Sequence, residues 1–396
     1  MMLRLNTLLT AFVVGFLGMT GVACGQAPRG PVQPTGASPE ASGWATETVV
    51  EGLNRPWGMA WLPDGQTMLI TERSGSLRLI RDGSLIAAPV AGVPGALAHG
   101  QGGLMDVVLH PSFERNRWVY LTMSTGTREA NRTALVRGVL SEDATRLVGA
   151  RTLFEVSQDK PGGQHFGSRL LWLPDGTLLM SIGDGGNPPT EVEGQHVRLF
   201  AQDVSSHFGK TLRLTEDGEP AANNPFSGHA EAAAEVFTYG HRNIQGMAID
   251  PATGTIYATE HGARGGDELN ILTPGTNYGW PAATYSIEYW GPRISDIASM
   301  PGAADPEVVW TPCIAPSGLT FYTGDRYPAW RGDLFAGGLV LRQIRRIDLE
   351  NGRVVGQETL SFDERVRDVR QGPDGFMYVL TDAGNGELLR IVTASE

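Results

Sequence analysis

Cysteine is scarce in this chain of 396 residues, which contains only Cys24 and Cys313. Small exported domains held by disulfides carry several pairs of cysteines at short spacings. Cys24 belongs to an N-terminal leader, so Cys313 has no partner within the folded part of the chain. We therefore expect no disulfide framework.

Positive charge and long helical patterns are also scarce. The formal net charge is −12, and the only lysines are Lys160 and Lys210. No basic stripe with interleaved aromatic residues is present, which argues against nucleic-acid binding. Helical periodicity is limited to a short stretch at 230–234, whereas 52 glycines and 25 prolines suit short strands joined by turns.

The N-terminus reads as an export signal over residues 1–24. Arg4 supplies the positive start, and the apolar run at 8–17 is too short to span a membrane. Cys24 precedes a flexible Pro/Gly/Ser/Ala-rich linker over residues 25–44. This layout predicts an exported protein, periplasmic or at the cell surface. Lipidation of Cys24 would tether it to a membrane, and ordinary cleavage after Ala27 is the alternative.

Six related units follow one another between residues 45 and 396. Each contains an apolar strand, a turn usually built from Pro, Asp and Gly, and a second strand. They lie at 57–71, 103–123, 170–182, 245–259, 317–337 and 366–381. The spacing of roughly 45 to 80 residues is in or above the range for propeller blades. A lone four-stranded sheet cannot bury both faces, but six packed radially can, so we predict an all-β, six-bladed β-propeller.

The third unit carries two polar residues of interest. Pro174-Asp175-Gly176 forms a hairpin turn between two apolar runs. His165 precedes the first strand and Asp184 follows the second, so both emerge at the same end of the hairpin. This pairs a base with an orienting carboxylate. Taken singly, however, His165 is more often a structural histidine.

Other polar residues flank the inner strands at corresponding positions. A cationic cluster contributed by several blades favours an anionic ligand with carboxylates or phosphates, because arginine matches their geometry. Taken alone, Arg169 fits an interblade ion pair equally well, and Arg365 and Arg367 fit a solvated surface. The set comprises Gln101, Arg169, His241, Arg242, Asn243, Arg365 and Arg367.

A glycine-rich loop at 260–270 and a second loop at 275–281 offer oxygen ligands. Glycines expose backbone carbonyls, and Asp267, Glu268 and Asn270 add side-chain oxygens. Oxygen-only ligation in a flexible loop suits Ca²⁺. Solvated acids beside a glycine-rich turn are the alternative.

Six motifs in order along the chain resemble a known family. They read HFGSRL…SIGDGG, YGHRNIQGMAID, TEHGARGGDELNIL, GTNYGWP, APSGLTFYTG and ERVRDVRQGPDGFMYVLTD. In this order, over residues 45–394, they resemble the soluble sugar dehydrogenases that depend on pyrroloquinoline quinone (PQQ). The resemblance implies a propeller that binds PQQ over its channel, with Ca²⁺ bridging protein and cofactor.

The resemblance also implies roles for individual residues. His165 matches the catalytic base, Asp184 the carboxylate that orients it, and Arg242 the arginine near the reactive carbonyl. The positions that match cofactor-binding residues are Gln101, His165, Arg242, Asn243, Arg365 and Arg367. Those that match metal ligands are Gly262 and Ala263, through their carbonyls, and Glu268 and Tyr278 for a second, structural Ca²⁺.

Two positions depart from the family pattern. A lysine that reaches the cofactor in relatives aligns with Val340, where Arg342 is a candidate substitute. Residues 311–314 (TPCI) lack the tryptophan of the glucose enzymes and look more like the aldose branch.

The expected reaction is oxidation of an aldose at its anomeric carbon to a lactone, with the electrons passed to an external acceptor. Two alternatives stay open at this point. A calcium-dependent lactonase would need several carboxylates converging on the channel, and a non-catalytic propeller that binds glycans or proteins would have lost the cofactor pocket.

Overall fold

The computed structural model of the protein describes residues 32–394. The expected export signal, Cys24 and residues 25–31 of the expected linker lie outside this range. Within the described range, no helix is long and apolar enough to cross a membrane.

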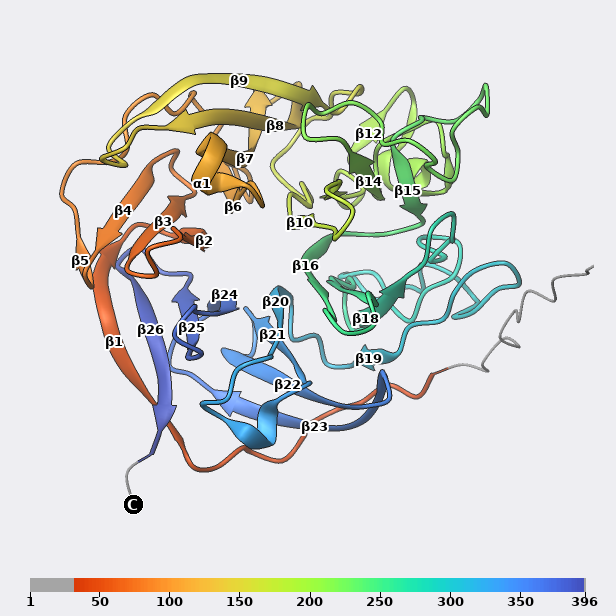
Figure 1. Cartoon of the computed structure of the whole chain (residues 1–396). Coiled ribbons are helices and arrows are strands. Elements are labelled where there is room, and N and C mark those ends of the chain that lie inside the picture. Colours follow the sequence, from red (N-terminus) through yellow and green to blue (C-terminus); the bar gives the residue numbers. More distant parts are fainter. Residues whose placement is uncertain (1–31, 395–396) are drawn as a thin grey trace, which may run out of the picture.

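Six four-stranded antiparallel sheets surround a central axis, which confirms the predicted six-bladed propeller (Figure 1). From the axis outward, blade 1 contains β2 (Pro56–Trp61), β3 (Thr67–Glu72), β4 (Leu77–Arg81) and β5 (Ser84–Leu85). Blade 2 contains β6 (Leu104–Leu109), β7 (Trp118–Gly126), β8 (Asn131–Leu140) and β9 (Leu147–Glu155). Blade 3 contains β10 (Leu170–Trp172), β11 (Leu178–Ile182), β14 (Lys210–Leu214) and β15 (Val236–Tyr239).

The second half of the ring repeats this arrangement. Blade 4 contains β16 (Ile244–Ile249), β17 (Ile256–Glu260), β18 (Asp267–Leu272) and β19 (Val308–Trp310). Blade 5 contains β20 (Pro316–Phe321), β21 (Leu334–Gly338), β22 (Gln343–Glu350) and β23 (Arg353–Ser361). Blade 6 contains β24 (Val366–Gln371), β25 (Met377–Thr381), β26 (Gly386–Thr393) and β1 (Trp44–Leu53).

Blade 6 closes the ring because its outermost strand comes from the N-terminal side of the chain. β1 pairs antiparallel with β26, from Trp44 opposite Thr393 to Leu53 opposite Gly386. Ahead of β1, the amides of Thr35 and Ala41 donate to the carbonyls of Val309 and Thr359, so this segment runs along the outer strands of blades 4 and 5 (Figure 1).

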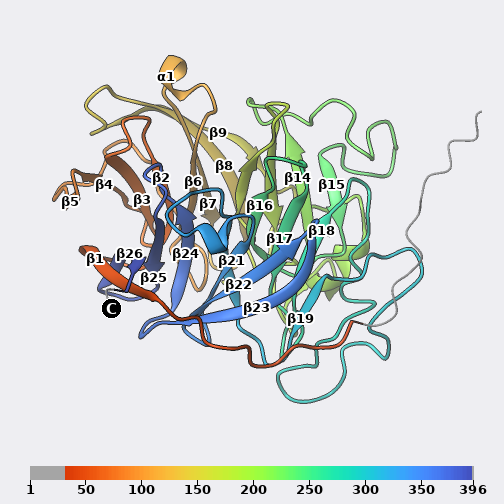
Figure 2. The same cartoon turned by 60° about the horizontal axis from the view of Figure 1, so that its bottom comes forward.

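Between residues 32 and 394, helical structure is limited to short elements. They are α1 (Phe113–Asn116), which projects beyond the blades in Figure 2, and the 3₁₀ turns η1 (Val197–Gln202) and η2 (Pro328–Trp330). A small hairpin of β12 (Glu191–Val192) and β13 (Gln195–His196) precedes η1.

The hydrophobic core lies between neighbouring blades. Leu69 and Leu79 of blade 1, for example, belong to one cluster with Leu121 and Val136 of blade 2. Every residue of β3 is buried, as expected for a strand covered on both faces. The blades are therefore stabilised by contact with each other.

The six inner strands share one equivalent position beside an irregularity in strand pairing. In β2, β6 and β20 the residue lies within a register shift, in β16 and β24 it ends the shift, and in blade 3 it immediately precedes β10. A side chain at Gly58 or Gly318 would overlap the carboxylates of Asp106 and Asp368, so glycine leaves room for charged neighbours. The six residues are Gly58, Asp106, Arg169, Gly246, Gly318 and Asp368.

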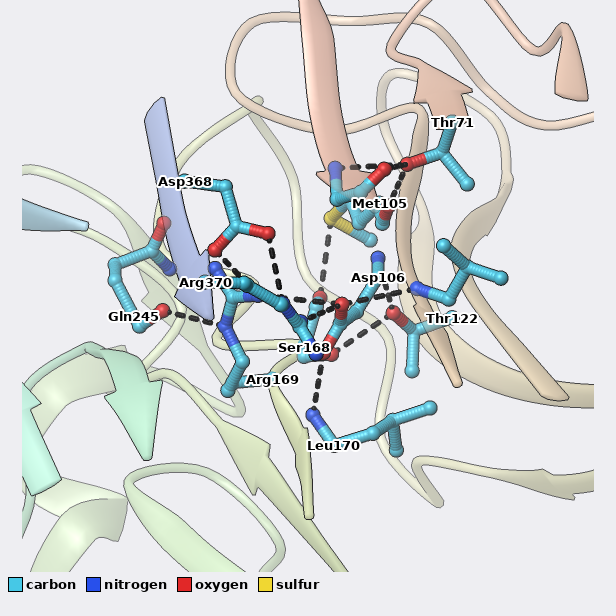
Figure 3. A network of polar contacts seen from close by, with 12 residues as sticks. Thr71, Met105, Asp106, Thr122, Ser168, Arg169, Leu170, Gln245, Asp368 and Arg370 are labelled. Carbon is cyan, nitrogen blue, oxygen red and sulfur yellow. Dashed lines mark hydrogen bonds and ion pairs between the residues drawn. The ribbon is translucent and has the colours of Figure 1, made fainter. Parts of the chain in front are cut away.

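Three of these residues, Asp106, Arg169 and Asp368, form a charged layer across the channel together with Arg370 (Figure 3). Arg169 Nη1 lies 3.2 Å from carboxylate oxygens of both Asp106 and Asp368. Arg370 contacts the same two carboxylates at 2.9 and 3.0 Å. Two cations and two anions thus balance while joining blades 2, 3 and 6. The ion-pair alternative considered for Arg169 is the one that the structure shows.

Hydroxyl groups on the second strands join consecutive blades. Thr122 of β7 accepts from the Asp106 amide at 2.9 Å and donates to the Ser168 carbonyl at 2.8 Å. Thr71 and Ser181 make the equivalent pairs of bonds from β3 and β11. Blades 1 to 4 are therefore aligned at the level of the charged layer.

Candidate active site

His165, which precedes β10, and Asp184, which follows β11, meet at one end of the third blade. His165 Nδ1 lies 2.6 Å from Asp184 Oδ1, and both side chains are buried. A carboxylate only accepts hydrogen bonds, so Nδ1 carries the proton and Nε2 keeps its lone pair. The predicted pairing of base and carboxylate is therefore geometrically present.

The segment before β10 has an unusual backbone that other blades support. His165 and Ser168 have φ values of 48° and 82°. Such conformations persist when their surroundings determine them. Gln101 accepts from the His165 amide at 2.8 Å, and Asn243 Oδ1 accepts from the Gly167 amide at 3.0 Å. Gln101 and Asn243 thus hold the backbone around the imidazole.

Electrostatics keep His165 neutral. Burial lowers the pKa of His165, and the positive charge of Arg242 lowers it further, whereas Asp184 opposes both effects. Neutral imidazole with a free Nε2 is the form required of a general base.

Asp184 is held by two further donors. Its Oδ2 accepts from the indole Nε1 of Trp280 at 2.8 Å, and its Oδ1 accepts from the Gly186 amide at 3.1 Å. Trp280 belongs to the GTNYGWP motif, but no role was predicted for it from the sequence. A buried indole beside a carboxylate has no signal in the local pattern, because blade 4 must first pack on blade 3.

Arg242 lies between this pair and the glycine-rich loop. Its Nη2 donates to Asn187 at 2.8 Å, and its Nη1 donates to the carbonyls of His261 and Gly262. Nε is buried and has no hydrogen-bond partner among the described residues. Trp280 lies beneath the guanidinium, 5.3 Å from ring centre to Cζ.

The glycine-rich loop borders a depression of about 600 Å³. Asp267 shapes the loop by accepting from the amides of Gly262 and Ala315, each at 2.7 Å. Burial raises the pKa of Asp267. The Gly262 carbonyl accepts from Arg242, and the Ala263 carbonyl accepts from the thiol of Cys313, which also lines the depression.

Glu268 occupies a different place, beside a second carboxylate. Burial raises its pKa well above the usual range, and the negative charge of Glu260 adds to this. Both acids and Tyr278 border a cavity of about 10 Å³, the size for one water or one ion. The Tyr278 hydroxyl is engaged by donating to the Ile271 carbonyl.

An arginine cluster surrounds one acid at the end of blade 6. Arg367 donates to Asp382 at 2.7 Å, and Arg365 lies 3.7 Å from the same carboxylate. Burial works to raise the pKa of Asp382, but Arg367, Arg73 and Arg365 outweigh it and lower this pKa. Burial lowers the pKa of Arg73, and the charges of Arg367, Arg55 and Arg365 contribute.

Arg55 and Arg73 were not predicted. They flank strands β2 and β3 of blade 1 as His165 and Asp184 flank the strands of blade 3, so the same positional rule would have found them. Three arginines act on the Asp382 carboxylate, and Arg55 acts on Arg73, so this rim carries a surplus of positive charge.

The two departures from the family pattern lie at the same depression. Val340 lines it and is 56% exposed, whereas Arg342 donates to the Asp363 carbonyl. Thr311 and Cys313 also line it. Tyr289 reaches the rim with its hydroxyl 3.5 Å from Arg242, on a short hairpin that the Arg198–Glu288 ion pair holds at 2.7 Å.

Comparison with known families agrees with this geometry. The family model for glucose/sorbosone dehydrogenases matches residues 53–390. The chain belongs to this family. Its members are oxidoreductases, which favours the dehydrogenase over the lactonase and the non-catalytic propeller.

The chain is similar to three characterised or solved members of the family. Aldose sugar dehydrogenase YliI from Escherichia coli is 40% identical over 87% of this chain and 92% of its own length. The crystal structure of the soluble aldose sugar dehydrogenase from E. coli in its apo form has a TM-score of 0.84 at 39% identity, covering 89% of this chain and all of that one. Quinoprotein glucose dehydrogenase B from Acinetobacter calcoaceticus is 27% identical over 88% of both chains. The PQQ-bound aldose sugar dehydrogenase from Streptomyces coelicolor has a TM-score of 0.69 at 28% identity, covering 90% of this chain and all of that one.

Proposed function

We propose that this sugar dehydrogenase uses PQQ and Ca²⁺ to oxidise aldoses at the anomeric carbon, producing lactones and passing electrons to an external acceptor. The observation that carries the proposal is the buried, neutral His165, which Asp184 orients and which lies within the electrostatic influence of Arg242.

The arginine cluster at the end of blade 6 and the nearby Arg242 fit an anionic quinone. The surplus positive charge of the arginine cluster suits a ligand with several carboxylates. The partnerless Nε of Arg242 is a buried donor that a ligand would satisfy. The quinone-bound relative from S. coelicolor supports this assignment. The residues that would hold PQQ are Gln101, His165, Arg242, Asn243, Arg365 and Arg367, with Arg73 added from the structure.

Two cation positions are proposed for Ca²⁺. The carbonyls of Gly262 and Ala263 border the depression and are hard oxygen donors of the kind that Ca²⁺ prefers. Glu268 and the main chain of Tyr278 would hold the second ion. A cation there would relieve the repulsion between Glu268 and Glu260, which now raises the pKa of Glu268.

The chain's own residues supply proton transfer and orientation. His165 Nε2 would accept the proton of the anomeric hydroxyl, and the carboxylate of Asp184 would stabilise the resulting imidazolium. Arg242 would stabilise negative charge that develops at the reacting centre. PQQ, when bound, supplies the acceptor for the hydrogen at the anomeric carbon with its two electrons, and Ca²⁺ polarises that acceptor.

The substrate class and the location of the protein are proposed from two further features of the sequence. TPCI at 311–314 and the E. coli relative favour an aldose sugar over glucose alone. The signal over residues 1–24 supports export, with lipidation of Cys24 as the way to anchor the protein to a membrane.

Reconstitution tests the proposal. Purified protein would be mixed with PQQ and CaCl₂, and reduction of an artificial dye would be followed over a panel of aldoses. We expect sugar-dependent dye reduction that requires both additions, and a matching change in the visible spectrum of the quinone. Loss of activity in His165→Ala with retained quinone binding would support the role of the base. Equal activity without PQQ would contradict the cofactor assignment.

A further inference from the structure

Lys160 is one of only two lysines in the chain, and the proposed reaction does not use it. Its side chain is 2% exposed. Its backbone is fixed by a pair of 2.9 Å hydrogen bonds with Asn131 at the start of β8. The side chain therefore points into the protein from a firmly held position.

The ammonium group of Lys160 lies against the segment that carries His165. Its Nζ lies 4.0 Å from the ring centre of Phe166, the residue after His165. Asn131 Oδ1 and the Gly162 carbonyl accept from Nζ at 3.2 and 3.4 Å. A cation over an aromatic face is attracted by the ring quadrupole, so the lysine holds Phe166 in place.

The stem of Lys160 reaches the other half of the dyad. A side-chain carbon added at Gly185 would lie 3.0 Å from Lys160 Cδ, and Gly185 directly follows Asp184. Lys160 thus packs against the neighbours of both His165 and Asp184.

We propose that Lys160 is a positioning residue that holds the His165–Asp184 pair and, through its charge, keeps His165 unprotonated as the pH falls. This inference rests on the proposed role of His165 as the base.

Lys160 and Arg242 are positive charges that act on His165 in the same direction, and both lower its pKa. Burial lowers the pKa of Lys160 to about 7, against the opposing effect of Asp184. Lys160 is therefore charged below neutral pH, and that charge is among the causes that lower the pKa of His165, after burial and Arg242. His261 also faces this site, but burial and Arg242 lower its pKa to about 3, so it adds no charge in this range.

Because the charge of Lys160 lowers the pKa of His165, its removal should shift the acid limb of the pH profile. Without the charge of Lys160, the pKa of His165 rises, so the base becomes protonated at a higher pH. In Lys160→Met, the acid limb of kcat/KM should move up by about half a pH unit to one unit. Lys160→Arg, which keeps the charge, should restore the wild-type limb.

Lys210 provides a matched control. It is also fully buried, burial lowers its pKa to about 7 as well, and it donates to the carbonyls of Phe200, Ala201 and Phe208. Lys210→Met should leave the acid limb in place. An equal shift in both variants, or no shift in Lys160→Met, would overturn the proposal.

A measurement without turnover separates this inference from the proposed function. In protein with ¹³C-labelled lysine and histidine, the two lysine Cε signals are assigned by the two Met variants. The pKa of His165 is then read from its ring carbon, without cofactor. A higher pKa of His165 in Lys160→Met than in wild type and Lys210→Met supports the coupling even if no sugar is oxidised. An unchanged pKa of His165 refutes it. Should Lys160→Met fail to fold, Lys160→Gln removes the same charge and takes its place.

Discussion

Replacement of Asp184 by asparagine changes one atom in the most constrained part of the site. Asp184 now accepts three hydrogen bonds, from His165 Nδ1, Gly186 N and Trp280 Nε1. An amide has one accepting oxygen and one donating nitrogen, so it cannot accept on both sides.

Each orientation of the amide in Asp184→Asn has a different cost. With its oxygen toward His165, its nitrogen meets the indole N–H of Trp280, and two donors face each other. With its oxygen toward Trp280, its nitrogen faces His165 Nδ1, which must then give up its proton to Nε2. The second orientation removes the base by imposing the wrong tautomer.

The size of the effect follows from these contacts. The second orientation also sets the amide nitrogen against the Gly186 amide, so either orientation leaves one buried donor without an acceptor and lowers stability by about 1–3 kcal/mol, and the second one also loses the base. Loss of general-base catalysis lowers kcat by about 100- to 10,000-fold. Quinone binding should change little, because the arginine cluster is untouched.

A double variant checks the reasoning. Trp280→Phe removes the indole donor, so Asp184→Asn/Trp280→Phe can turn its amide oxygen back to His165. We expect the double variant to recover about tenfold in kcat over Asp184→Asn, the equivalent of about 1.4 kcal/mol. Steady-state dye reduction and thermal melts measure both effects. Activity of Asp184→Asn within threefold of wild type, or a double variant no better than the single one, would refute the argument.

Three further predictions concern the metal, the channel and the substrate. Chelation of Ca²⁺ should abolish turnover and lower the melting temperature, because an ion bound only by the native state adds about 2.7 kcal/mol at 100 times its Kd. Asp106→Asn should destabilise the fold by about 3–5 kcal/mol, because it leaves Arg169 and Arg370 short of a buried partner. Mono- and disaccharides should differ in kcat/KM by no more than about a hundredfold, because the depression is open and Tyr289 at its rim is 54% exposed.

Each of these predictions has a contrary outcome. Full turnover and an unchanged melting temperature after chelation would remove both metal assignments. Denaturant unfolding of Asp106→Asn should be compared with Asp325→Asn, which breaks an exposed ion pair with Arg331 and should change stability little. Equal stability of the two variants would contradict the role of the charged layer. Preference for one sugar over its epimers by more than about a thousandfold would identify the Tyr289 hairpin as a specificity lid.

The fold and the dyad were accessible to sequence reasoning because they depend on local patterns. Asp-Gly turns between apolar runs specify hairpins, and six repeats specify a closed ring. His165 and Asp184 are 19 residues apart on one hairpin, so strand pairing alone brings them together. The sequence did not show that the outermost strand of blade 6 is β1, since this pairing joins opposite ends of the chain.

Contacts between blades were decided only by the tertiary structure. Trp280 reaches Asp184 across 96 positions of sequence, and Arg370 reaches Asp106 across 264. Which residues meet at the axis depends on how the twist and packing of all six sheets add up when the ring closes. The same closure determines that Arg55 and Arg73 join Arg365 and Arg367.

By itself, then, the sequence determined a propeller of six blades and the end of each hairpin at which polar residues emerge. The tertiary structure decided which of those residues are buried, and burial sets their chemistry. His165 is neutral and Lys160 titrates near neutral pH because neighbouring blades exclude water from them, and a linear pattern of residues does not carry that information.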